Sequence, residues 1–151
     1  MDITLKQLRD SFGALQALAQ IEFKAKTAYR LGRILDSAVS EINIFNKAHL
    51  ALIEKHGAVD VPVLDDDSRP VLDEQGQPRT QKTVPKDKLK EFEPEFLDLL
   101  TGPATLWGEP LHIDLLGEVE IAPAILAPLD WLIVDGSEKA EKPKSAAASG
   151  D

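Results

Sequence analysis

Residues 25–57 of this chain read AKTAYRLGRILDSAVSEINIFNKAHLALIEKHG, and this stretch decides the fold. Seven apolar side chains and one histidine recur in it at alternating steps of three and four residues: Ala28, Leu31, Leu35, Ala38, Ile42, Phe45, His49 and Leu52. Such spacing places these side chains along one face of an α-helix. We therefore predict one long helix over residues 27–56, ended by Gly57 in a left-handed conformation.

A second helical pattern precedes this stretch, over residues 4–20. Thr4 is a suitable N-cap, and Gln7 stands where a capping-box partner belongs. Four apolar side chains then follow on one face: Leu5, Leu8, Phe12 and Leu15. Extended forward, this stripe falls on polar positions, so its phase differs from that of the long helix. We predict a break between residues 21 and 26, and hence an antiparallel helical hairpin over residues 4–57.

Residues 58–84 have the character of short extended segments interrupted by turns. Valines alternate with other residues over 59–63, and a second extended piece covers residues 70–72. Acidic turns follow each piece, and the prolines restrict both to edge or irregular strands. We predict a protruding β-hairpin or ordered loop. We identify no internal repeat at a fixed period.

The remainder predicts a third helix followed by a mixed, acidic part. The helix begins at Pro85 and is kinked or divided at Pro94. Beyond it, residues 111–115 and 118–121 are expected to pair as short strands. The fold class is thus α+β, mainly α, with a single domain over residues 1–135. Residues 136–151 carry no large apolar side chain, and we expect them to be disordered.

The charge of the 151-residue chain is uneven. Its 17 Lys and Arg against 26 Asp and Glu give a net charge of −9. Residues 1–57 sum to +2, whereas residues 58–135 sum to −11. There is no cysteine, which excludes disulfides, thiolate metal sites and cysteine nucleophiles. No apolar run is long enough to span a membrane, and the start lacks the pattern of a secretory signal.

Residue patterns for catalysis or metal binding are weak. His49 and His56 lie two helical turns apart, too far to share one ion. The acidic turn at residues 65–67 fails the calcium-loop pattern, because Arg69 occupies the fifth position of that loop. The sequence contains neither a phosphate-binding glycine loop nor a G-x-S-x-G nucleophile motif. We expect no enzymatic activity, no cofactor and no metal ion.

Two charged patches and one tryptophan are the candidate partner surface. The basic patch comprises four cations within ten residues: Lys24, Lys26, Arg30 and Arg33. The acidic patch lies on the third helix: Glu91, Glu95 and Asp98. Trp107, in a Gly- and Pro-rich segment, is either a core residue or an anchor for a partner. We expect a protein partner or a second copy, and neither nucleic acid nor membrane, since nucleic-acid sites usually lie on basic domains.

Lys26-Thr27-Ala28-Tyr29-Arg30-Leu31 resembles the core of a family of small, functionally uncharacterised phage and prophage proteins. The resemblance extends over residues 3–57, including the helix end at residues 52–57, and more loosely over the rest. It departs at Phe23-Lys24, where the family has Leu-Pro, and in a longer insertion at residues 61–82. The resemblance implies a phage-encoded origin and supplies no catalytic residues.

The leading hypothesis is a non-enzymatic, phage-related protein-interaction or assembly protein. It rests on the long helical stripe and on the weak catalytic patterns. The alternative is an inhibitor whose acidic residues 58–135 mimic nucleic acid and bind a host DNA-binding protein. We expect a location in the host cytoplasm or in the virion.

Overall fold

The computed structural model describes residues 1–135, and the predicted disordered tail lies outside this range. The fold is α+β and mainly helical, with 54% helix and 16% strand. This confirms the predicted fold class. Two compact units make up the structure: Met1–Ile42 with Gly102 onward, and Asn43–Thr101. Helix α2 contributes residues to both.

Helix α1 spans Leu5–Ala19 and begins as predicted. The hydroxyl of Thr4 accepts a hydrogen bond from the amide of Gln7 over 3.1 Å. The side chain of Gln7 accepts one from the amide of Thr4 over 2.9 Å, which completes the capping box. The buried face of the helix differs from the predicted stripe, since Ser11 and Leu18 are buried as well and Phe12 is only half-buried.

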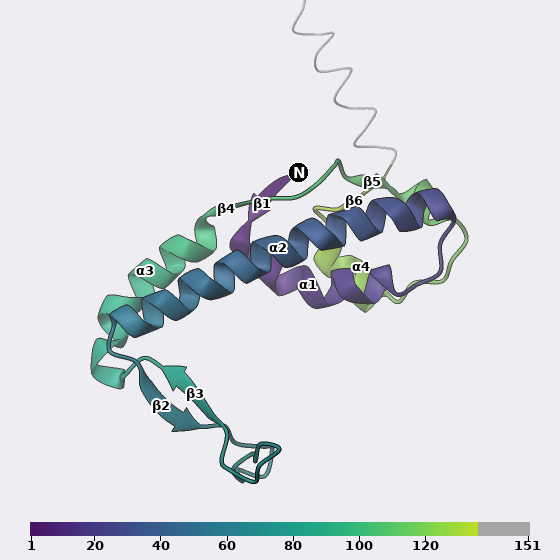
Figure 1. Ribbon diagram of the computed structural model, residues 1–151. Coiled ribbons are helices and arrows are strands. Elements are labelled where there is room, and N and C mark those ends of the chain that lie inside the picture. Colours follow the sequence, from purple (N-terminus) through teal and green to yellow (C-terminus); the bar gives the residue numbers. More distant parts are fainter. Residues whose placement is uncertain (136–151) are drawn as a thin grey trace, which may run out of the picture. The chain divides into compact units, whose positions relative to one another are not determined.

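Helix α2 spans Ala25–Lys55 and runs antiparallel to α1 (Figure 1). The break falls at residues 20–24, which overlaps the predicted interval between residues 21 and 26 but begins one residue earlier. The predicted stripe faces inward except at its start, where Thr27 is buried and Ala28 exposed. The buried hydroxyl of Thr27 donates a hydrogen bond to the carbonyl of Leu115 over 2.8 Å, which offsets its loss of contact with water. Gly57, with a φ of 78°, follows the end of the helix in the predicted left-handed conformation.

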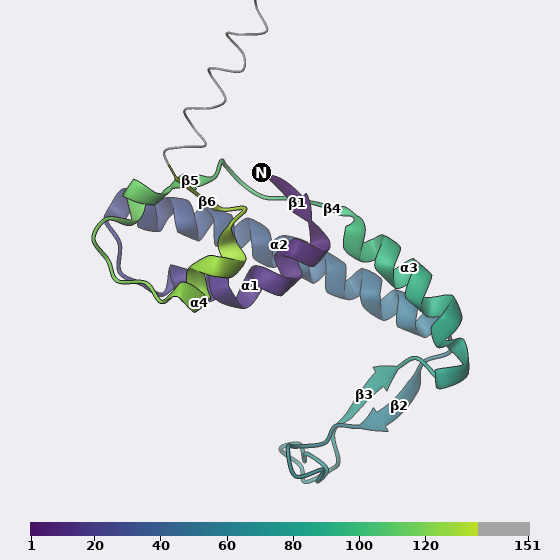
Figure 2. The same ribbon diagram turned by 180° about the vertical axis from the view of Figure 1, so that it is seen from behind.

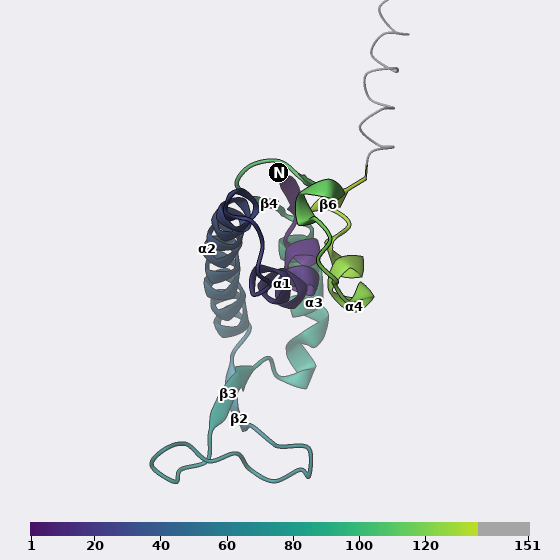
Figure 3. The ribbon, with the colours of Figure 1, turned by 90° about the vertical axis from the view of Figure 1, so that its right-hand side faces the viewer.

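In the first unit, two pairs of short strands join distant parts of the chain. Strand β1 (Asp2–Thr4) pairs antiparallel with β4 (Pro103–Thr105), and β5 (Leu111–His112) pairs parallel with β6 (Ile133–Val134). Helix α4 (Pro123–Leu126) lies beside α1 (Figure 3). The largest fully buried apolar side chains of this unit come from α1, α2, β5 and the segment after α4: Leu8, Leu15, Leu18, Leu31, Ile34, Leu111, Leu129 and Leu132.

The predicted pairing of residues 111–115 with residues 118–121 is wrong. Ile113–Leu116 forms a 3₁₀ turn instead. The imidazole Nδ1 of His112 caps this turn by accepting a hydrogen bond from the amide of Asp114 over 3.2 Å. Leu111 meanwhile donates its amide to the carbonyl of Leu132 over 2.7 Å. The backbone groups that would form the predicted hairpin are therefore used elsewhere.

In the second unit, helix α3 (Leu89–Thr101) lies beside the last turns of α2 (Figures 1 and 2). A 3₁₀ turn at Lys86–Lys88 leads into α3 after Pro85. The helix continues through Pro94 and is not divided there. Aromatic rings form the contact between α2 and α3: Phe45, His49, His56, Phe92 and Phe96.

The same unit carries a two-stranded arm, defined here as residues 59–83. Strand β2 (Val59–Pro62) pairs antiparallel with β3 (Thr80–Thr83), so a β-hairpin is present as predicted (Figure 1). Its second strand, however, is β3 and not the predicted residues 70–72. The prolines explain the difference, since Pro70 and Pro78 make only isolated bridges, to Leu64 and Leu72 respectively.

The connection at the end of the arm, residues 63–79, is the arm tip, and it contains a tandem repeat. Residues 63–70 read VLDDDSRP and residues 71–78 read VLDEQGQP. The prediction of no internal repeat is therefore wrong for this segment. The two octapeptides fold alike. In each, the aspartate at the third position accepts two backbone hydrogen bonds, and the sixth residue, Ser68 or Gly76, has a positive φ.

Three backbone hydrogen bonds close the base of the arm tip into a ring. The amide of Val63 donates to the carbonyl of Arg79 over 2.9 Å. That of Arg79 donates to Val71 over 2.7 Å, and that of Val71 donates to Val63 over 2.9 Å. The three donors are eight residues apart, which is the length of the repeat. Both octapeptides are thereby held to one another and to the end of the β2–β3 ladder.

Candidate protein-binding surface

Trp107 lies against α2, in the first unit. Its backbone amide donates a hydrogen bond to the hydroxyl of Ser37 over 3.0 Å. Ser37 in turn donates to the carbonyl of Ile34 over 2.8 Å, so its hydroxyl is fully oriented. These bonds attach the segment after β4 to the N-terminal half of α2. The position of Trp107 is therefore set by its backbone, and its indole remains half-exposed.

Two side chains of α2 contact the indole. The ring of Tyr29 meets it edge-on, with centroids 6.5 Å apart and an interplanar angle of 85°. The guanidinium carbon of Arg33 lies 5.1 Å from the ring centroid, within the range of a cation–π contact. Tyr29 is nevertheless 61% exposed, the largest value among the exposed large hydrophobic side chains. The three side chains thus form an ordered cluster that is open to solvent.

The remaining cations of the basic patch belong to the same face of α2. Lys26, Arg30 and Arg33 are spaced by four and three residues, and Tyr29 lies between them. Lys24 immediately precedes the helix. We name this set the basic–aromatic surface: Lys24, Lys26, Tyr29, Arg30, Arg33 and Trp107.

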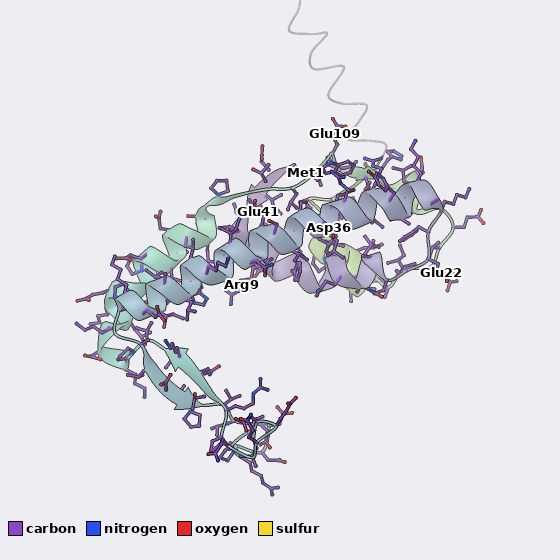
Figure 4. All side chains as sticks on the ribbon, viewed as in Figure 1. Met1, Arg9, Glu22, Asp36, Glu41 and Glu109 are labelled. Atoms are coloured by element: carbon purple, nitrogen blue, oxygen red, sulfur yellow. The ribbon has the colours of Figure 1, made fainter. Side chains whose placement is uncertain are left out.

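None of the four cations of the basic–aromatic surface forms an ion pair with a residue in 1–135. The lysines at the start of α2 do not stabilise the helix either. A helix N-terminus carries a partial positive charge, which disfavours cations there, and the first turn of α2 has no acidic residue to offset them. Acidic side chains are present nearby along the chain: Glu22 lies at the connection between α1 and α2, Asp36 on α2, and Glu109 just after Trp107 (Figure 4). The positive charge of the surface thus lies on one face of α2 and just before its start, and it has no ion-pair partner within residues 1–135.

The three acidic candidates lie in the second unit, on α3, and two of them are engaged there. Lys55 donates hydrogen bonds to both oxygens of Glu95, over 2.9 and 3.0 Å. Lys88 lies 4.0 Å from Glu91. Asp98 lines a shallow depression that includes Ala48, Leu52, Glu95 and Leu99. The structure therefore brings Trp107 into contact with Arg33 of the basic candidates and places the acidic candidates in a different unit.

Glu95 has a further neighbour in His56. The imidazole Nε2 of His56 is 3.5 Å from a Glu95 oxygen, is buried, and has no hydrogen-bond partner among residues 1–135. The hydrogen bond from Lys55 lowers the pKa of Glu95 below its ordinary value of 4.5, and His56 acts in the same direction. Because Glu95 is exposed to water, this cluster contributes a local contact between α2 and α3 and little more.

Two residues were not among the candidates: Tyr29, which belongs to the surface, and Ser37, which holds Trp107 in place. Tyr29 was visible in the sequence as an aromatic residue inside the basic patch, but nothing indicated that its ring would meet Trp107. Ser37 gave no sequence signal, because its part depends on a segment that is 70 residues away.

Comparison with known proteins gives no further assignment. No protein-family model matches the chain. Neither the curated proteins nor the solved structures include a match. Within residues 1–135, no helix is both long and apolar enough to cross a membrane. The same residues contain no group of three or more His, Asp and Glu side chains arranged to hold a metal ion.

Proposed function

We propose that this chain is a non-enzymatic, phage- or prophage-related interaction protein that binds an acidic segment of a protein partner through the basic–aromatic surface. The observation that carries the proposal is the position of Trp107, which is fixed by Ser37 and contacted by Tyr29 and Arg33. Trp, Tyr and Arg are the residue types that most often dominate the binding energy of protein interfaces.

The geometry of Arg33 suits recognition of a carboxylate. Its contact with the indole orients the guanidinium before a partner arrives, so less side-chain entropy is lost on binding. The free edge of a guanidinium donates paired hydrogen bonds that match a carboxylate. Arg30 and Lys26 add positive charge on the same helix face, which accelerates encounter with an acidic partner.

A protein partner is favoured over nucleic acid on charge. The chain as a whole carries −9, which repels a phosphate backbone at longer range. The acidic side chains of residues 58–135 also divide between the arm, α3 and the segment after β4, which belong to two units. Mimicry of a nucleic acid needs an ordered array of such charges, so we do not propose it.

The test is binding of a fluorescein-labelled decapeptide of Asp, Glu and Leu, followed by fluorescence anisotropy. We expect Arg30→Gln with Arg33→Gln to weaken binding roughly tenfold or more, because two charged donors are lost, one of them oriented by Trp107. The matched control is Lys47→Gln with Lys86→Gln, which removes the same charge from exposed positions of the second unit and should leave affinity unchanged.

Two results would contradict the proposal. One is equal weakening by the control pair, which would mean that only net charge matters. The other is a single-stranded DNA decamer that binds more tightly than the peptide at the same salt concentration, since this would make nucleic acid the preferred partner.

A further inference from the structure

The arm tip exposes two leucines at equivalent positions of its repeat. Leu64 is 53% exposed and Leu72 is 57% exposed, each at the second position of its octapeptide. Exposed acidic side chains stand beside them: Asp66, Asp67 and Glu74. None of these three carboxylates forms an ion pair within residues 1–135. The tip therefore presents apolar and acidic side chains together, with no partner in the described chain.

The arm tip is also ordered in advance of any contact. The ring of hydrogen bonds through Val63, Val71 and Arg79 fixes its base. Asp65 and Asp73 each fix one turn by accepting two amide hydrogen bonds. A loop of 17 residues held in this way loses little conformational entropy on docking. Its leucines are thus displayed by a rigid support, as expected of a docking element.

We propose that the arm tip of one copy docks on the basic–aromatic surface of a second copy. This inference rests on the proposed function and identifies the acidic partner as the same protein. The tip offers what the surface lacks, namely carboxylates for Arg30 and Arg33 and leucine side chains to cover Trp107. Both sets of charges are unpaired within residues 1–135, and they are opposite in sign.

Other acidic segments fit the surface less well. On α3, Glu91 and Glu95 already face Lys88 and Lys55. In the first unit, Glu118 and Glu120 flank one exposed apolar side chain, that of Val119, which is 39% exposed. The arm tip has two leucines, and each of them is more exposed than Val119. The arm tip is therefore the occupant that the charges and the exposed apolar side chains favour.

The proposed contact joins two different surfaces, so each copy supplies one arm tip and one basic–aromatic surface. Such a contact is either exchanged reciprocally between two copies, which closes a symmetric dimer, or propagates from copy to copy into a larger ring or an open chain. In either arrangement both the arm tip and the basic–aromatic surface are required, and this separates the proposal from association through any other face.

The experiment is sedimentation velocity of the full chain, at concentrations rising to about 1 mM. We expect the unmodified protein to form dimers or larger assemblies. Arg30→Gln with Arg33→Gln should abolish them, and so should Leu64→Ser with Leu72→Ser. Asp66→Asn with Glu74→Gln is a second tip variant that leaves both leucines in place. Leu50→Ser, which changes an exposed leucine on α2, and Glu118→Gln with Glu120→Gln are the controls that should assemble normally.

Mixing the two defective proteins gives the decisive measurement. The surface variant retains an intact tip, and the leucine variant retains an intact basic–aromatic surface. Together they should form one contact and stop at a heterodimer, although each alone is a monomer.

Three results would overturn the proposal: an unmodified protein that stays monomeric, tip variants that assemble normally, or a mixture that shows no heterodimer. Binding of the acidic peptide with any of these results would leave the proposed function intact. Loss of peptide binding as well would remove both.

Discussion

The indole Nε1 of Trp131 donates a hydrogen bond to the hydroxyl of Ser11 over 3.0 Å, across 120 residues of sequence. The same hydroxyl donates to the carbonyl of Gln7 over 2.6 Å, within α1. Ser37 has the corresponding role on α2. Its hydroxyl accepts a hydrogen bond from the backbone amide of Trp107 and donates one to the carbonyl of Ile34. Each long helix of the first unit thus uses one serine to attach a distant tryptophan segment.

Replacement of Ser11 by alanine tests the first of these attachments. The change leaves the Trp131 N–H without its partner and should lower the free energy of unfolding by about 1–3 kcal/mol. Urea unfolding followed by tryptophan fluorescence measures the effect. Ser40→Ala, at an exposed position of α2, is the control and should change stability by less than about 0.5 kcal/mol. Equal stability of the two variants would mean that water replaces the Ser11 hydroxyl at no cost.

Gly57→Ala tests the end of α2. Apart from its neighbours in the chain, no residue has an atom within 4 Å of the added methyl group, so any cost comes from the φ of 78° and not from crowding. We expect a loss of about 1–2 kcal/mol in the free energy of unfolding. Gly13→Ala is the opposite case, because that glycine also has open space around it but lies inside α1. It should stabilise the protein by up to about 1 kcal/mol, and destabilisation there would show that the glycine has another purpose.

The two turns of the arm tip allow a paired exchange at equivalent positions. Ser68→Gly relieves a positive φ of 61° in a non-glycine residue and should slow amide hydrogen exchange at Val63, Val71 and Arg79. Gly76→Ala introduces the same strain in the second turn and should accelerate exchange at these amides. Exchange rates of α1 amides serve as the internal reference. Identical tip rates in both variants would show that the turns do not control the hydrogen-bonded ring.

Glu95 gives a pH dependence with a defined sign. The pKa of Glu95 is lowered in the folded chain, chiefly by the hydrogen bond from Lys55, so its ionised form stabilises the fold above pH 4.5. This contribution is lost as the pH falls below 4.5 through the lowered value. The stability of Glu95→Gln should therefore approach that of the unmodified protein at acid pH, and added salt should reduce their difference at neutral pH. A difference that grows on acidification would contradict this assignment.

The helices were predictable from the sequence because their determinants are local. Thr4 and Gln7 are three residues apart, and Gly57 directly follows the last turn of α2. The pairings β1–β4 and β5–β6 could not be predicted, since each joins short segments with no distinctive pattern of their own. The partner surface could be predicted only in part. The cations stood together in the sequence, whereas the contact of Arg33 with Trp107 depends on how a distant segment returns to α2.

The ring of hydrogen bonds at the base of the arm tip has a consequence for chain length. Val71 already accepts a hydrogen bond from Arg79 and occupies the same place in its octapeptide as Val63 does. Removal of residues 63–70 would join Pro62 directly to Val71, and one new bond from Val71 to Arg79 would complete an ordinary antiparallel pair. The arm can thus gain or lose length in steps of eight residues while β2 and β3 keep their register. The tandem octapeptide is what a single in-frame duplication of a hairpin end would leave behind.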